Sequence, residues 1–353
     1  MSKKRDVKKN SPKNVSQAVT MADVAKAVGV SRQSVGLVFN GKPGVGTETE
    51  VKIRKAAREI GYRPNRAAQS LRQDSTNYVG VVFHPNEATM GELLPALHNE
   101  AQKYGFEILL SAISEEHNEI QAIDSLLGHR CLGLIIIGSQ LSVTRLQKLA
   151  REIPLVSLGR RLTGVRCGIV TSDGEAGVEA ATRHLIDIGH TDIAYILGKD
   201  MTEGPYRLAG YVKAMERARL KVDVVTIYGD YAMRGGASAA DEFMHRKKLP
   251  TAIVCNNDES AVGLWHRFAQ HGIKVPEDVS LVGYDDSLAH FSYLDMTSVT
   301  QDPKELAVAA VKDVAGRISG EQYLAKTYLT SANVVVRTST SQPVHLLNSR
   351  SNS

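Results

Sequence analysis

The residues best suited to reading nucleic-acid bases stand together at Arg32, Gln33 and Ser34, directly after Ser31. A serine can cap the start of a helix, which would place the next three side chains at that helix's amino-terminal end. Arginine and glutamine side chains there can hydrogen-bond DNA base edges in the major groove through two atoms at once. The alternative is a small helical bundle with a polar exposed face, and the surrounding elements decide between the two.

A helix–turn–helix pattern surrounds these residues. Thr20 and Asp23 have the spacing of a capping box at the start of a first helix, and Gly29 can end that helix in the left-handed conformation. Ala25 in the first helix and Val35 in the second are the small and apolar residues that such packing needs. The spacing therefore favours a DNA-binding head over a plain bundle.

A third helix with Thr47 as its N-cap completes the predicted head, which covers residues 19–63. The first 74 residues contain sixteen basic and six acidic side chains, a net charge of +10, whereas the remainder carries −5. A basic head on a mildly acidic body fits a polyanion-binding protein. Residues 1–18 are polar and Lys-rich, which predicts disorder, and a merely solvated basic tail is the alternative reading of the charge.

From Tyr78 onward, short apolar strands alternate with helices. Strands are predicted at 79–83, 106–112, 132–137, 155–158, 193–197, 224–228, 252–255 and 279–282. Helices are predicted at 92–104, 120–127, 175–188, 206–219, 237–246 and 259–270. The alternation predicts an α/β body over residues 77–340, built from two doubly wound parallel-sheet subdomains that hold a ligand between them. Residues 341–353 are predicted to form a loose tail.

Several functional classes find no support in the sequence. The three cysteines, Cys131, Cys167 and Cys255, have apolar neighbours and are predicted to be buried thiols in a reducing compartment. No apolar run approaches the roughly 20 residues that span a bilayer, and no apolar core follows the basic start as in a signal peptide. Phosphate-loop, nucleophile-elbow and zinc-protease motifs are missing as well. We therefore expect a cytoplasmic protein without catalysis, cofactor or metal, rather than an enzyme or a solute-binding transport protein.

Motifs along nearly the whole chain resemble the LacI/GalR (lactose-repressor/galactose-repressor) family. In the head they are Val-Thr-Met-Ala-Asp-Val-Ala-Lys-Ala-Val-Gly-Val-Ser at 19–31, Phe-Asn-Gly at 39–41 and Gly-Tyr-Arg-Pro-Asn-Arg-Ala-Ala-Gln-Ser-Leu at 61–71. In the body they are Gly-His-Thr-Asp-Ile-Ala-Tyr-Ile at 189–196, Arg-Leu-Ala-Gly-Tyr at 207–211, Asn-Asp at 257–258, Val-Pro-Glu-Asp-Val-Ser-Leu-Val-Gly-Tyr-Asp-Asp at 275–286 and Arg-Thr-Ser-Thr at 337–340. They follow the family's order, which implies a periplasmic-binding-protein-like body behind the head.

The resemblance implies a bacterial-type repressor, associated with the nucleoid, that binds a near-palindromic double-stranded operator as a homodimer. Each head would place its second helix in the major groove. Residues 64–76 would form a hinge helix, and Leu71 matches the leucine that enters the minor groove and kinks the duplex; an ordinary core leucine is the alternative. The residues assigned to DNA contact are Thr20, Ser31, Arg32, Gln33, Ser34, Leu37, Asn40, Asn65, Arg66, Ala68 and Leu71.

The resemblance also implies effector contacts at Arg207, Asn257, Asp285 and Asp173. Guanidinium, amide and carboxylate groups suit the vicinal hydroxyls of a sugar or nucleoside, so the effector is predicted to be sugar-like. Without the resemblance, Asp285 and Asp286 would be strand-end carboxylates that cap a turn, and Arg207 would form a surface ion pair. Ligand binding could either release or promote DNA binding.

Two departures from the family pattern bear on specificity. Gly36 and Leu37 stand where the family usually has Ser-Arg, so Leu37 cannot donate to guanine and can instead touch a thymine methyl group. In the body, His-Pro-Asn-Glu-Ala-Thr-Met at 84–90 replaces a common aromatic-rich Asn-Pro-Phe-Phe, and Gly159-Arg160 replaces a common Asp-Arg. The predicted ligand site therefore lacks an aromatic side chain on which a sugar ring could stack, and it lacks one acceptor for a ligand hydroxyl.

Overall fold

The computed structural model describes residues 19–63, 76–198, 202–227, 232–321 and 324–343. The chain separates into a head that ends at Thr76 and a body that begins at Asn77. The predicted basic tail at 1–18, the predicted hinge apart from Thr76, and residues 344–353 of the predicted tail lie outside the described residues.

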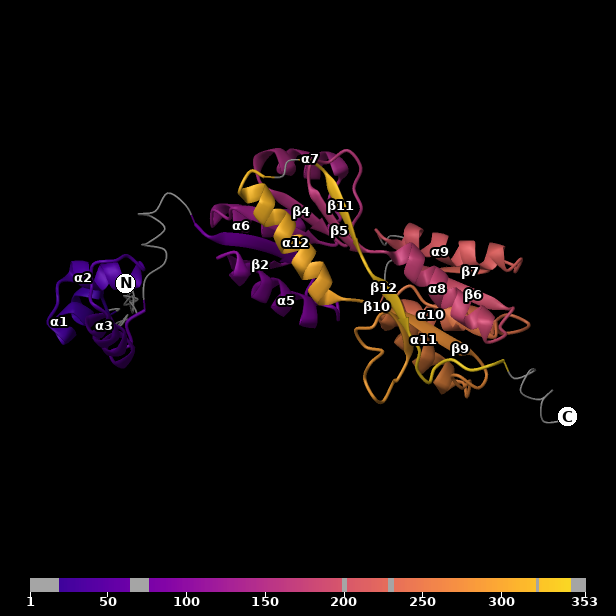
Figure 1. Cartoon of the computed structure of the whole chain (residues 1–353). Coiled ribbons are helices and arrows are strands. Elements are labelled where there is room, and N and C mark those ends of the chain that lie inside the picture. The colour runs from indigo at the N-terminus through magenta and orange to yellow at the C-terminus, as the bar shows by residue number, and fades with distance from the viewer. Residues whose placement is uncertain (1–18, 64–75, 199–201, 228–231, 322–323, 344–353) are drawn as a thin grey trace, which may run out of the picture. The chain divides into compact units, whose positions relative to one another are not determined.

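Within residues 19–63, the head contains three helices (Figure 1): α1 Met21–Val28, α2 Arg32–Phe39 and α3 Thr47–Glu59. The predicted capping box at the start of α1 is confirmed, because the backbone N–H and the hydroxyl of Thr20 both donate to the Asp23 carboxylate at 2.8 Å. Gly29 ends α1 with a φ of 72°, a conformation that costs glycine little. These two ends set the length of the helix that precedes the turn.

The start of α3 corrects the sequence analysis. Gly46 is the N-cap, Thr47 is already the first helical residue, and no side chain caps the helix. Acidic side chains take over part of that role. Glu48 and Glu50 occupy the first turn, where negative charge interacts favourably with the positive end of the helix dipole.

One small apolar core holds the three helices together. Val24, Val35 and Ile53, from α1, α2 and α3 respectively, are fully buried against one another. Phe39 and Tyr62 close this core edge to face, with ring centroids 5.3 Å apart. The core fixes the angle between α1 and α2 and leaves the amino-terminal end of α2 exposed.

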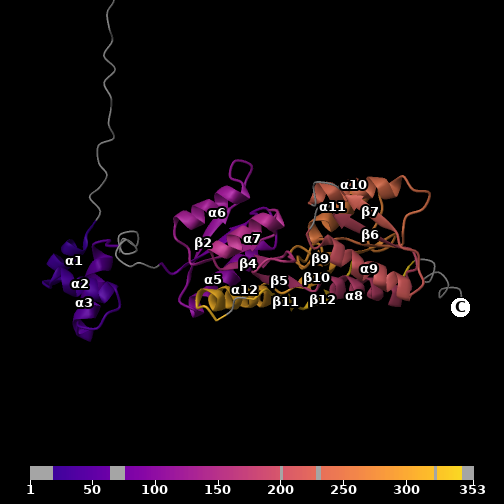
Figure 2. The same cartoon turned by 90° about the horizontal axis from the view of Figure 1, so that it is seen from above.

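The first lobe of the body is a six-stranded sheet in the order β11-β5-β4-β3-β1-β2, with every pair parallel. Its strands are β1 Tyr78–Phe83, β2 Glu107–Ala112, β3 Gly133–Ile137, β4 Leu155–Leu158, β5 Gly168–Ser172 and β11 Lys326–Thr330. Its helices are α5 Met90–Lys103, α6 Glu119–Gly128, α7 Val143–Glu152 and α12 Pro303–Ile318. Figure 2 shows α5 and α12 on one face of this sheet and α6 and α7 on the other. Each pair of helices packs against the strands through a separate apolar core.

The second lobe repeats this plan in the order β12-β10-β9-β8-β6-β7, with β12 antiparallel to β10. Its strands are β6 Ile193–Gly198, β7 Val224–Ile227, β8 Ala252–Val254, β9 Ser280–Asp285, β10 Thr297–Gln301 and β12 Ala332–Val335. Its helices are α8 Gly174–Asp187, α9 Gly204–Arg217, α10 Met233–Met244 and α11 Asp258–Gln270. Helices α8 and α9 cover one face of the sheet, and α10 and α11 cover the other (Figure 2).

The chain crosses between the lobes three times. It leaves the first lobe after Ser172 at the end of β5, returns after Gln301 at the end of β10, and crosses again between β11 and β12. The predicted pair of doubly wound sheets is confirmed, and all three crossings begin after a polar residue that ends a strand.

Four strands and two helices escaped the sequence analysis: β5, β10, β11, β12, α7 and α12. Strand β10 shows why, because its Thr297 and Ser298 are buried polar residues rather than apolar ones. Their hydroxyls are satisfied internally: Thr297 donates to the carbonyl of Arg337 at 3.2 Å, and Ser298 donates to Asp258 at 2.7 Å. Hydropathy cannot mark a strand whose burial depends on hydrogen bonds with distant residues.

The predicted burial of the cysteines is confirmed, since Cys131, Cys167 and Cys255 are free thiols in the protein interior. In the part of the chain that the structure describes, no helix is long and apolar enough to cross a membrane. No group of three or more His, Cys, Asp and Glu side chains within the described ranges could hold a metal ion.

The head core predicts a local effect of Ile53→Ala. This substitution should remove about 2–5 kcal/mol from the stability of the head, because Ile53 is fully buried in the small core. Val51→Ala, an exposed position on the same helix, should cost less than about 0.5 kcal/mol. Calorimetry of the full chain should show a lower head transition for Ile53→Ala alone, and a matching fall in the body transition would contradict two separate units.

Candidate functional sites

The amino-terminal end of α2 presents polar groups to solvent. Ser31 is the N-cap and accepts a hydrogen bond from the Ser34 backbone N–H at 3.0 Å, and the two hydroxyls lie 2.9 Å apart. Arg32 and Gln33 are exposed, and no acidic residue lies in the first turn. A helix end with exposed cationic and amide groups and no acid attracts anions such as phosphate.

Three other residues assigned to DNA contact have visible structural roles. The Thr20 hydroxyl is engaged by Asp23, and Asn40 is the exposed C-cap of α2. Leu37 is half-buried, and its Cδ1 would lie 3.2 Å from a Cβ placed on Gly44. The Leu37 side chain therefore lies close to the loop after α2. The remaining four assigned residues, Asn65, Arg66, Ala68 and Leu71, lie outside the described residues.

The second candidate site centres on Arg207 of α9, which is only 5% exposed. Its guanidinium donates to the carbonyl of Asn256, lies 3.6 Å from the Asp285 carboxylate, and stacks on the Tyr284 ring with 3.6 Å between Cζ and the ring centroid. This burial rules out the alternative that Arg207 forms an ion pair at the surface. A buried guanidinium needs such matched partners, so Arg207 organises the groups around it.

Asp285 is the last residue of β9, in the second lobe. Its φ of 104° is rare for a residue with a side chain, and it turns the chain sharply after the strand. Burial raises the pKa of the Asp285 carboxyl to about 7, although the nearby Arg207 opposes the shift. The neighbouring Asp286 is instead paired with Arg337, at 2.8 Å. Two adjacent carboxylates therefore have different partners.

A hydrogen-bonded chain links Asp285 to the lobe crossings. The Gln301 side-chain amide donates to Asp285, and its oxygen accepts from the Ser172 hydroxyl at 2.7 Å. The Tyr284 hydroxyl lies 2.8 Å from the same serine hydroxyl, which has one proton to give, so Tyr284 is the donor there. We call Ser172, Arg207, Tyr284, Asp285 and Gln301 the crossover network, because Ser172 and Gln301 directly precede two of the crossings.

The other two predicted effector residues lie at helix starts beside this network. The Asn257 side chain caps α11 by accepting from the Ser260 N–H at 2.9 Å, and Asp173 caps α8 by accepting from the Ala176 N–H at 3.2 Å. Both side chains are half-buried. Asp173 directly follows the end of β5, and Asn257 lies three residues after the end of β8. The structure brings Arg207 and Asp285 into direct contact. Asn257 directly follows Asn256, whose carbonyl accepts from Arg207, and Asp173 directly follows Ser172 of the crossover network.

The lobes also meet at contacts that the sequence analysis did not find. Arg161, in the loop after β4, pairs with Glu203 at 3.3 Å and stacks on Tyr206 with Cζ 3.9 Å from the ring centroid. The backbone N–H of Ala88 donates to Glu259 at 3.3 Å. Each contact joins the first lobe to the start of a helix in the second. No local sequence signal could have found pairs that are more than forty residues apart.

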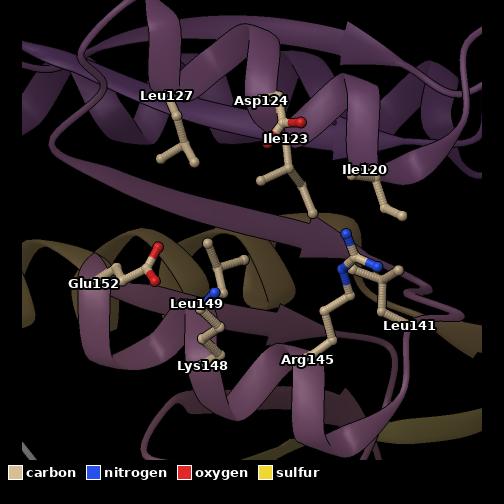
Figure 3. A pocket seen from close by; sticks show the side chains of 9 residues that line it. All are labelled: Ile120, Ile123, Asp124, Leu127, Leu141, Arg145, Lys148, Leu149 and Glu152. Carbon is tan, nitrogen blue, oxygen red and sulfur yellow. The ribbon is translucent and has the colours of Figure 1, made fainter.

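A separate hollow lies between α6 and α7 (Figure 3). It is lined by Ile120, Ile123, Asp124, Leu127, Leu141, Arg145, Lys148, Leu149 and Glu152. Its volume of about 150 Å³ is smaller than the ~300–1,000 Å³ usual for small-molecule sites. None of the predicted ligand residues lines it.

Comparison with known families matches both parts of the chain. Residues 20–65 match the family described as "Bacterial regulatory proteins, lacI family". Residues 182–340 match the "Periplasmic binding protein-like domain". The first match contains the helix–turn–helix elements, and the second contains Arg207, Asn257 and Asp285.

Characterised relatives match over most of their length. The HTH-type transcriptional repressor PurR of Vibrio campbellii is 30% identical over 327 residues, covering 90% of this chain and 97% of the relative. The HTH-type transcriptional regulator GalR of Salmonella typhimurium is 31% identical over 338 residues, covering 92% and 96%. Both relatives are regulators of transcription by name.

Solved structures show the same architecture. The lac repressor dimer bound to operator and the anti-inducer ONPF superposes with a TM-score of 0.78 at 26% identity, covering 92% of this chain and all of that chain. A LacI transcriptional regulator from a Rhodococcus species gives 0.71 at 32% identity, covering 75% and 98%. The likeness to the lac repressor therefore covers head and body.

The raised pKa of Asp285 predicts a pH-dependent stability difference. The folded chain holds the Asp285 proton more tightly than the unfolded chain, whose aspartates titrate near 4. The stability that this proton contributes is fully present below pH ~4 and is lost as the pH rises through about 7. Asp285→Asn does not titrate, so the free energy of unfolding of the wild type minus that of the variant should fall from pH 5 to pH 8.

Denaturant unfolding of both proteins at several pH values measures this difference. Asp124→Asn, an exposed change on α6, sets the background. A difference between wild type and Asp285→Asn that stays constant or grows with pH would contradict the raised pKa.

Proposed function

Because the chain belongs to the LacI family of bacterial regulatory proteins, we propose that it is a transcriptional repressor whose operator affinity is set by a small polyhydroxylated effector. The observation that carries the proposal is the combination of an exposed, acid-free start of α2 with a buried Arg207–Asp285 pair at the carboxyl end of β9 in the second lobe. The chain acts in the cytoplasm, at the nucleoid, as a homodimer, and we assign it no catalysis.

In the head, α2 enters the major groove of a near-palindromic operator. Arg32 and Gln33 contact base edges, because they are exposed at the helix start that faces the groove in this kind of head. Ser31 and Ser34 lie at the same end and contact the backbone phosphates together with Thr20 and Asn40. Leu37, which is half-buried, supplies an apolar edge for a thymine methyl group.

Residues 64–76 form the hinge helix of each protomer when the head is on DNA. Asn65, Arg66 and Ala68 lie along the minor groove, and Leu71 enters between base pairs and kinks the duplex. Unstacking costs a few kcal/mol, which the additional contacts on the bent DNA offset. This assignment is supported by the family's sequence pattern, which the chain follows through Leu71.

In the body, the effector's hydroxyls bind to Arg207, Asn257, Asp285 and Asp173. Arg207 and Asp285 supply a donor and an acceptor side by side, which matches a pair of vicinal hydroxyls. Asp285 is also hydrogen-bonded to Gln301, and Gln301 is hydrogen-bonded to Ser172. A ligand at Asp285 is therefore linked by hydrogen bonds to the two residues that precede the first two lobe crossings. The effector changes operator affinity only as far as it prefers one arrangement of the lobes over another.

DNA binding tests the head assignment. Arg32→Ala should weaken binding to a selected palindromic operator by roughly 10- to 100-fold, because a bidentate base contact is worth about 1–3 kcal/mol. Lys55→Ala removes one exposed positive charge from α3 and serves as the matched control. Affinities for selected and random DNA are measured over a salt series, since the non-specific part of binding falls steeply with salt.

The expected pattern is a large loss on the selected operator for Arg32→Ala, with a loss on random DNA no greater than that of Lys55→Ala. An equal loss for Arg32→Ala on both DNAs would show that Arg32 only supplies charge.

A further inference from the structure

The loop after β4 in the first lobe is fastened to the start of α9 in the second lobe. The Arg161 guanidinium pairs with one carboxylate oxygen of Glu203 at 3.3 Å, and the Arg161 backbone N–H donates to the other oxygen at 3.0 Å. The Thr202 hydroxyl donates to the carbonyl of Gly159 at 3.0 Å, and Arg161 stacks on the ring of Tyr206. We call these five residues the lobe clasp, because each contact joins one lobe to the other.

The charged pair of the lobe clasp is largely withdrawn from water. The side chains of Arg161 and Glu203 are 19% and 8% exposed, although they belong to different lobes. Their attraction is stronger there than in water, but the cost of removing two charges from water offsets much of it. Separation of the lobes would hydrate both charges again. The contact is therefore suited to hold the lobes together reversibly rather than permanently.

The lobe clasp and the crossover network meet in the first turn of α9. Glu203 is the N-cap of this helix, and its backbone carbonyl accepts from the Arg207 N–H at 3.1 Å. Arg207 in turn contacts Asp285 at 3.6 Å. A single helical turn thus carries both the carboxylate that binds the first lobe and the guanidinium at the centre of the second candidate site.

We propose that the lobe clasp is a closing device built into the body, in which the Arg161–Glu203 pair holds the lobes together independently of any effector. Every contact in it is made by groups of the chain itself, so no ligand is needed to form it. The proposal goes beyond the proposed function, because it assigns part of the preference for joined lobes to the protein. A bias of this kind lowers the ordering cost that a ligand between the lobes would otherwise meet.

Three substitutions separate the charged pair from its surroundings. Arg161→Met keeps an unbranched side chain that can still lie on Tyr206, but it removes the guanidinium. Glu203→Gln keeps the shape of the side chain and removes its charge. Arg166→Met is the matched control, because Arg166 is exposed in the same loop between β4 and β5 and its loss removes the same charge.

Distances between spin labels on the two lobes of the full chain test the proposal, with no small molecule added. The labels are attached at Thr144→Cys on α7 and Ser238→Cys on α10, because both positions are exposed on helices. The native cysteines are buried, and a chain without the added cysteines measures their background labelling. Labelled chains are diluted with unlabelled chains, so that the measured pairs lie within one chain.

Arg161→Met and Glu203→Gln should each raise the ratio of longer to shorter distances by roughly tenfold, the effect expected when one charged hydrogen bond is lost. The double variant should show no larger change than either single variant, because both substitutions remove the same pair. Arg166→Met should keep the distances of the wild type. Circular dichroism of each variant checks that the body is folded, and Glu203→Gln alone suffices if Arg161→Met does not fold.

A distance distribution that stays unchanged in Glu203→Gln would overturn the proposal, and so would an equal shift in Arg166→Met. Additive shifts in the double variant would also contradict it, since they would show that the two residues act separately. None of these results would affect the proposed function, because an effector can change operator affinity without the lobe clasp.

Discussion

The buried charge of Arg207 is the constraint on which the body depends. A guanidinium that is only 5% exposed must be matched by nearby acceptors, and these come from β9 and the segment after β8. Satisfying it fixes α9 against the carboxyl ends of these strands. Asp285, its acidic partner, has a strained backbone conformation with a φ of 104°.

The same interaction reaches the boundary between the lobes. Asp285 is bonded to Gln301, Gln301 to Ser172, and Ser172 to Tyr284, on which Arg207 stacks. A molecule that contacts Arg207 and Asp285 is therefore connected by hydrogen bonds to Gln301 and Ser172, which precede two of the three crossings. Coupling between binding sites needs an element with two arrangements that both ligands favour differently, and the lobe crossings are suited to be that element.

Direct contacts also join the two lobes. Arg161 pairs with Glu203 at 3.3 Å, and the Ala88 backbone N–H donates to Glu259 at 3.3 Å. The head depends on different physics, since its small core leaves one helix end exposed to DNA. The core of the head joins residues that are close in sequence, whereas the charged pairs of the body join residues that are far apart in sequence.

Local patterns predicted the elements whose ends and cores are encoded nearby. The capping box at Thr20, the left-handed Gly29 and most helices of the body follow from spacing alone. The polar strand β10 could not be predicted, because its burial depends on hydrogen bonds to residues about forty positions away. The family resemblance named Arg207 and Asp285, but no pattern indicated that they touch, or that Arg161 pairs with Glu203 across the lobes.

The most direct measurement is the ratio of operator affinities with and without saturating effector, in the wild type and in Gln301→Met. This substitution keeps the side chain's approximate volume and removes both of its hydrogen bonds in the crossover network. If the network transmits binding, the variant should bind effector within a few-fold of the wild type, while the ratio falls from about 5- to 150-fold toward one. An unchanged ratio at equal effector affinity would contradict this account.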